Sequence, residues 1–260
     1  MCRQIGLWTL IFVVMFGLPI WAAASPPKRL DSAGQPVEMF QAMRDGQIEV
    51  KFIPKDAKEA SVLIKNKTDK PLTIKLPDAF AAVPVLAQLD AGGGGRTTTT
   101  GTSTTQALGG GWGGGMMGGM GPGMMGGGMW NVPPEKIAQL KVPVVCLEHG
   151  KPDPRPAVPY EIKPLEAFST TPGLREVLQA LGSGLVSQRV AQAAAWHLQN
   201  GMSFQELASK QLRFANGTRC PFFSPAEIRA AMQLVAKAKQ KAQQSQPSSS
   251  ASPGESVSQN

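Results

Sequence analysis

The chain has 260 residues and a net charge of +8, and much of the positive excess lies late, where residues 169–245 hold nine Lys and Arg against three Asp and Glu. Such a surface favours an anionic or cell-envelope partner, whereas nucleic acid is not expected because no compact basic cluster with interleaved aromatic residues is present. With two histidines, no nucleophile elbow and no phosphate-binding glycine loop, hydrolase and nucleotide chemistry are not indicated either.

The first residues have the order of a secretory signal peptide. Arg3 precedes an apolar run at residues 5–21, and small residues follow up to Ala24. This pattern predicts a signal peptide over residues 1–24, cleaved after Ala24, and therefore a secreted, periplasmic or cell-envelope protein. The prolines that follow at once argue against a spanning helix, so membrane attachment would require an uncleaved signal segment.

After a proline-rich leader at residues 25–45, the pattern changes to short β-strands. Apolar and polar residues alternate in segments that are separated by turn-forming residues. We expect strands near 48–53, 61–65, 72–76, 83–89, 136–147 and 160–162. Their close spacing predicts an antiparallel, Ig-like β-sandwich over residues 46–168.

The predicted sandwich is interrupted by a Gly/Thr-rich and then Gly/Met-rich stretch. Residues 91–131 offer little apolar surface to offset the entropy of ordering glycines, so we expect a disordered insertion. Thioethers are soft ligands that suit Cu(I), which an exported protein can meet. The insertion is therefore a candidate copper site, with Met116, Met117, Met120, Met124, Met125 and Met129 as ligands. No other cofactor is expected.

The last third of the sequence has helical periodicity. Four helical patterns begin at about Thr171, Ser187, Ser203 and Ser224. The last two open with capping boxes, and Gly201 stands where the second helix should end. We expect a small helical module over residues 169–243 and a disordered tail at 244–260.

Two cysteines remain after signal cleavage. Cys146 and Cys220 would meet oxidising conditions outside the cell, which makes a disulfide between them one candidate. Sequence alone does not show whether their geometry permits this bond.

A second candidate role for Cys146 comes from a resemblance. The segment Ala191–Trp196 resembles the Thr-Gln-x-Ala-Ile-Trp signature of the thioester domains of surface adhesins, with Ala in place of the Thr and the Ile. Residues 145–147 resemble the cysteine segment of that family. The resemblance implies that Cys146 and Gln192 condense with loss of ammonia to an internal thioester, which an amine then attacks. The two roles of Cys146 exclude each other.

The overall layout also resembles secreted bacterial proteins of uncharacterised function, through a Cys-Leu-x-x-Gly-x-x-x-Pro motif at 146–154 and an Ala-Gln-Ala-Ala-Trp-His-Leu-like segment at 191–198. The leading hypothesis is an exported, non-catalytic binding or structural component of the cell envelope. Covalent surface attachment through Cys146 and Gln192 is the first alternative, and Cu(I) binding is the second.

Overall fold

The computed structural model describes residues 35–85, 105–112, 124–125 and 128–245. The predicted signal peptide and most of the predicted tail lie outside these residues. Among the helices that are described, none combines the length and the apolar character needed to cross a membrane.

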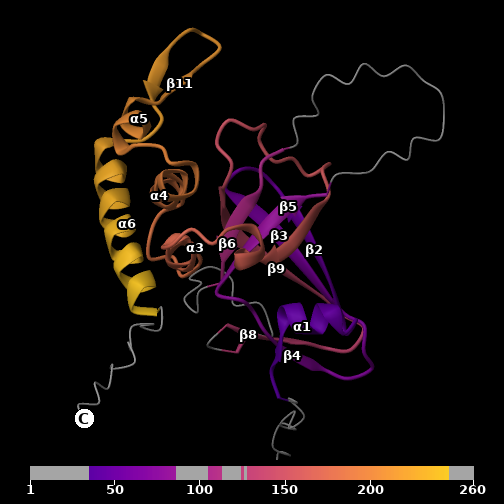
Figure 1. The fold of residues 1–260 in the computed structure, drawn as a ribbon. Coiled ribbons are helices and arrows are strands. Elements are labelled where there is room, and N and C mark those ends of the chain that lie inside the picture. Colours follow the sequence, from indigo (N-terminus) through magenta and orange to yellow (C-terminus); the bar gives the residue numbers. More distant parts are fainter. Residues whose placement is uncertain (1–34, 86–104, 113–123, 126–127, 246–260) are drawn as a thin grey trace, which may run out of the picture. The chain divides into compact units, whose positions relative to one another are not determined.

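Six antiparallel strands form a closed barrel (Figure 1). Around the barrel their order is β10-β2-β3-β9-β6-β5, and β10 closes the ring by pairing with both β5 and β2. The strands are β2 (Ile48–Pro54), β3 (Glu59–Asn66), β5 (Ala79–Pro84), β6 (Leu108–Gly111), β9 (Ile137–Cys146) and β10 (Tyr160–Pro164).

Alternating side chains fill the barrel. Along β3, Ala60, Val62 and Ile64 are fully buried and alternate with less buried neighbours. Phe52 of β2 meets Phe80 of β5 edge to face, with ring centroids 5.9 Å apart. The predicted alternation near 48–53 and 61–65 is thus confirmed, because one face of each strand is turned to the core.

Two smaller sheets accompany the barrel. One has the order β1-β4-β8-β7, and the other is a two-stranded hairpin. Their strands are β1 (Val37–Glu38), β4 (Leu72–Lys75), β7 (Met124–Met125) and β8 (Met129–Val132), and for the hairpin β11 (Gln211–Arg213) and β12 (Arg219–Pro221).

The predicted Ig-like β-sandwich is wrong, because the main sheet closes on itself. A sandwich has two sheets with free edges, whereas the barrel pairs every strand on both sides. The expected strand at 72–76 is present as β4, but it leaves the barrel and joins the smaller sheet. Neither fact is visible in the alternation pattern, which reports one buried face and not the partner strands.

The barrel closes through a strand made largely of glycine. Part of the insertion expected to be disordered at 91–131 is ordered: residues 105–112 are buried and contain β6, which pairs with β5 and β9. A Cβ on Gly111 would lie 2.4 Å from the carbonyl oxygen of Leu178, and one on Gly182 would lie 2.3 Å from Gly111. Glycine is required at these two positions because the backbone of β6 lies against the backbone of the helix α3 (Leu174–Gly182).

Helices cover one side of the barrel. α3 contacts β5, β6 and β9, α4 contacts β9, and α6 packs on α3 and α4 from outside, as Figure 1 shows. The four helices that the periodicity predicts in this part of the chain are present, with Ser187 capping α4 and Gly201 ending it at a φ of 69°. The helices are α1 (Met39–Arg44), α2 (Leu165–Phe168), α3 (Leu174–Gly182), α4 (Gln188–Asn200), α5 (Phe204–Ser209) and α6 (Pro225–Ser245).

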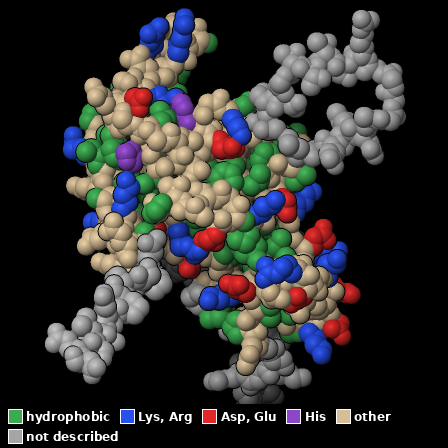
Figure 2. All heavy atoms as spheres, viewed as in Figure 1, with side chains coloured by type: hydrophobic (Ala, Val, Ile, Leu, Met, Phe, Trp, Pro, Cys, Tyr) green, Lys and Arg blue, Asp and Glu red, His purple; other side chains and the backbone are tan. Residues whose placement is uncertain are grey.

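On the face drawn in Figure 2, the charged surface of the barrel is mixed in sign. In the view of Figure 2, acidic and basic side chains are interspersed near the end of the barrel that carries α1. A surface of this kind does not by itself select an anionic partner.

Candidate functional site

The site begins where β9 ends with one edge uncovered. On one side, the Leu147 N–H donates to the Ala107 carbonyl at 2.9 Å, which continues the pairing with β6. On the other side, β3 pairs with β9 only as far as Pro143. Successive residues of a strand turn their polar groups to opposite edges, so the N–H and C=O of Cys146 face the side without a strand.

A side-chain amide from α4 takes the place of the missing strand. The Cys146 N–H donates to Gln192 Oε1 at 2.8 Å, and Gln192 Nε2 donates to the Cys146 carbonyl at 2.8 Å. Both residues are buried, with 2% and 4% of their surfaces exposed. The Cα of Cys146 lies between this N–H and this C=O, and it carries the Cβ to which the sulfur is bonded. The structure thus brings together the two residues that the thioester resemblance singled out.

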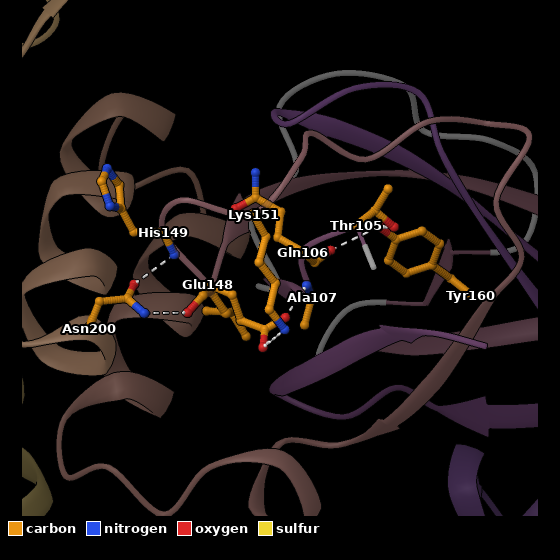
Figure 3. A network of polar contacts seen from close by, with 9 residues as sticks. Thr105, Gln106, Ala107, Glu148, His149, Lys151, Tyr160 and Asn200 are labelled. Atoms are coloured by element: carbon orange, nitrogen blue, oxygen red, sulfur yellow. Dashed lines mark hydrogen bonds and ion pairs between the residues drawn. The ribbon is translucent and has the colours of Figure 1, made fainter. Parts of the chain in front are cut away.

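Two further amides on the same face of α4 hold the chain on either side of Cys146. One turn before Gln192, Gln188 Nε2 donates to the Val144 carbonyl at 3.1 Å. Two turns after it, Asn200 Nδ2 donates to the Leu147 carbonyl, while Oδ1 accepts the His149 N–H, as seen in Figure 3. The helix therefore fixes the position of the strand end at several points.

The loop after Cys146 is also tied to the barrel (Figure 3). The Glu148 carboxylate accepts the Ala107 N–H at 2.8 Å and forms an ion pair with Lys151. The Tyr160 hydroxyl donates to the Gln106 carbonyl at 2.8 Å, which fixes the entry to β6. Cys146 is consequently held from both the helix side and the barrel side.

Cys146 and Gln192 both line a cavity of about 460 Å³. The rest of its wall combines aromatic and basic side chains with amide and small or aliphatic residues, and its one acidic residue is Asp153. Its aromatic and basic lining residues include His149, Arg189, Trp196, Lys210, Phe222 and Phe223.

Aromatic rings form a continuous part of the wall. Trp196 of α4 lies with its ring centroid 5.6 Å from that of Phe222 and 5.9 Å from that of Phe223. His149 meets Trp196 edge to face at 4.7 Å. Lys210 Nζ lies 5.4 Å from the centroid of Trp196, within the range of a cation–π contact.

Burial is the largest cause of the pKa shifts of Cys146 and of His149, which both line the cavity. Removal from water raises the pKa of the Cys146 thiol to about 12, with smaller contributions from Asp153 and Asp56. Burial, followed by the charge of Lys210, lowers the pKa of His149 below its usual value. The thiol and the imidazole are therefore both neutral at neutral pH.

Cys220, the other cysteine of the predicted disulfide, lies in β12. Both it and Cys146 are free thiols, and the structure does not join them. The contacts of Cys146 with Gln192 bear on its second candidate role, the thioester.

The predicted copper site lies almost entirely outside the described residues. Of its ligands, Met116, Met117 and Met120 are outside, only the backbone of Met124 and Met125 is described, and Met129 belongs to β8. Copper binding stays a prediction. Within the described part of the chain, no group of three or more His, Cys, Asp or Glu side chains is placed to hold a metal ion.

Sequence reasoning did not assign a role to Gln188, Asn200 or Lys210. The spacing of Gln188, Gln192, Trp196 and Asn200 by multiples of four places them on one helix face, which is a signal that amides line a buried edge. The position of Lys210 depends on how the segment after α5 folds back, and no local pattern reports this.

No family model matches this chain, and no curated protein or solved structure is significantly similar to it.

Proposed function

We propose that this chain is an exported attachment protein that forms an internal thioester between Cys146 Sγ and Gln192 Cδ and passes the acyl group to an amine. The observation that carries this proposal is the carboxamide of Gln192, held by both polar groups of Cys146 in a buried site beside a cavity. Export rests on the signal peptide pattern of residues 1–24.

The proposed chemistry is a pair of acyl transfers. In the first, the sulfur adds to Cδ, the C–N bond breaks, and ammonia leaves with the thiol proton. In the second, an amine adds to Cδ, the C–S bond breaks, and the sulfur regains a proton. No oxidant or reductant is needed, and the second step leaves the chain covalently bound to the carrier of the amine.

The geometry favours the first step in two ways. The Cys146 N–H points at Oε1, where negative charge develops when sulfur adds, and a preorganised donor of this kind stabilises such a charge. Holding the Gln192 carboxamide on the backbone of Cys146 in a buried site also reduces the entropic cost of bringing the thiol and the carboxamide together.

Burial serves the storage of the thioester. The raised pKa of Cys146 keeps the thiol neutral, and condensation converts a neutral thiol and a neutral amide into neutral products. No buried charge is created in the product. Exclusion of water then protects the thioester from hydrolysis until an amine enters the cavity.

Intact mass spectrometry tests the proposal. The purified chain should weigh about 17 Da less than its sequence requires, the mass of the lost ammonia, and methylamine should add to it while one new thiol appears. Cys146→Ala and Gln192→Ala should abolish the deficit and the adduct. The matched controls Cys220→Ala and Gln188→Ala alter the other described thiol and a neighbouring amide of α4, and should retain both.

An unshifted mass without a methylamine adduct, in a chain that circular dichroism shows to be folded, would refute the thioester. Gln192 would then be a structural clamp for β9, and the function would reduce to non-covalent binding or a structural role in the envelope.

A further inference from the structure

The ammonium group of Lys210 lies in the cavity without a carboxylate partner among the described residues. Its Nζ is 5.4 Å from the ring centroid of Trp196 and 5.5 Å from that of Phe222. It is also 2.9 Å from His149 Nε2. An ammonium has donors only, so it donates this hydrogen bond and the imidazole accepts it in its neutral form.

The backbone fixes where this side chain starts. Lys210 follows α5 directly, and its carbonyl accepts the Phe222 N–H at 2.7 Å. One of the rings that binds the ammonium is therefore tied to the residue that carries it. The aromatic faces of Trp196 and Phe222 and the Nε2 of His149 together form a small site for an amine, which we call the amine seat.

We propose that the amine seat recognises a primary amine at the end of an unbranched alkyl chain, such as a lysine side chain of a partner protein, and that Lys210 occupies it until the partner arrives. This inference rests on the proposed function, because the seat lines the same cavity as Cys146 and Gln192. The resident lysine has the chemistry of the expected ligand: aromatic faces attract the ammonium and cover the methylenes next to it.

The seat also prepares the amine for attack. An amine acts as a nucleophile only without its extra proton, and Nε2 of a neutral imidazole is the acceptor to which that proton can pass. Arg189, whose guanidinium lies 5.3 Å from the ring centroid of Phe222, does not occupy the amine seat, because it forms an ion pair with Glu227. Arg189 therefore stays in place when Lys210 leaves the seat.

The test uses the Cys146→Ala chain, in which no thioester can form, so that binding is measured apart from the chemistry. n-Butylamine is titrated into Cys146→Ala and into the same chain with Lys210→Ala, and the heat of binding is recorded. Vacating the seat should tighten n-butylamine binding by roughly five- to tenfold, the worth of one cation–π contact.

Two matched variants control this experiment. Lys210→Met refills the seat with an uncharged chain of similar length that lacks the cation–π contact, and it should bind n-butylamine less tightly than Lys210→Ala. Lys151→Ala removes another lysine of the cavity wall, one that pairs with Glu148, and should leave binding unchanged. Circular dichroism of each variant checks folding.

Equal binding by the Lys210→Ala chain and its parent would overturn the seat. The mass deficit of the unaltered chain decides separately whether a thioester forms, so failure of the seat and failure of the proposed function are distinguishable. Where the deficit is present, Lys210→Ala should also increase the rate of adduct formation with n-butylamine, and an unchanged rate would count against Lys210 as the occupant.

Discussion

At the scale of single residues, Gln192 supplies the hydrogen bonds that a neighbouring strand would give to Cys146. Its carboxamide satisfies a buried N–H and a buried C=O of Cys146, each of which would cost about 1–3 kcal/mol if left unpaired. Condensation to the thioester would keep the bond to Oε1 and give up the one from Nε2. The same contact thus both satisfies the polar groups at the strand end and places the carboxamide that would react at Cδ.

His149 should make the stability of the protein fall in mild acid. Burial and then Lys210 hold its pKa in the folded chain below the value of 6.5 that it has when unfolded. Below pH 6.5 the imidazole of His149 is therefore protonated in the unfolded chain and still neutral in the folded chain. The free energy of unfolding consequently decreases as the pH falls from 6.5 toward the pKa of the folded chain. Urea unfolding at pH 7.5, 6.5 and 5.5 should show a larger loss for the unaltered chain than for His149→Gln.

A second variant isolates the cause. Lys210→Met removes the nearby positive charge and should reduce the acid sensitivity without abolishing it, since burial is the larger cause. Parallel pH profiles for all three chains would show that His149 does not carry the effect.

At the scale of elements, β6 shows where sequence patterns fail. Strands are recognised by side chains that alternate between a core and a surface, and a run of Leu-Gly-Gly-Gly has no such alternation. The glycines of residues 109–111 are needed because α3 and Phe80 approach the strand closely. Absence of side chains therefore signals close contact here, whereas composition alone predicted disorder.

Gly111→Ala should be strongly destabilising. Its new methyl would lie within 3 Å of backbone atoms of Leu178 and Asp78, which cannot rotate away. We expect a loss of at least about 2 kcal/mol in the free energy of unfolding, the upper range for overpacking. In the matched variant Gly109→Ala, the close atoms are the ends of leucine side chains, so the loss in urea unfolding should be about 1 kcal/mol. Equal losses would mean that the barrel adjusts to the added volume.

The candidate site was predictable in part. Cys146 and Gln192 could be singled out from short motifs, and the helix that carries Gln192 was readable from its periodicity and its glycine cap. The wall of the cavity was not, because His149, Lys210 and Phe222 come from separate segments that only the tertiary fold brings together. Strand order and closure of the barrel were unreadable for the same reason.

At the scale of the whole described unit, the barrel and the helices share one core. Buried residues of β6 and β9 pack with those of α3 and α4 in a single cluster, and amides of α4 complete the edge of β9. Neither part keeps its buried surface covered without the other. Unfolding should therefore be cooperative across the boundary between strands and helices.

Native-state hydrogen exchange checks this cooperativity. Amides of β3, such as those of Val62 and Ile64, and amides of α6 near Ile228 should converge on one opening free energy as denaturant is added. The exposed hairpin of β11 and β12 serves as the internal control and should exchange at much lower free energy. Asn200→Ala, which removes two hydrogen bonds between α4 and the loop after β9, should lower the values for β3 and α6 by the same amount. A selective loss in α6 would show instead that the helices unfold independently of the barrel, and that the pairing of Cys146 with Gln192 opens before the barrel does.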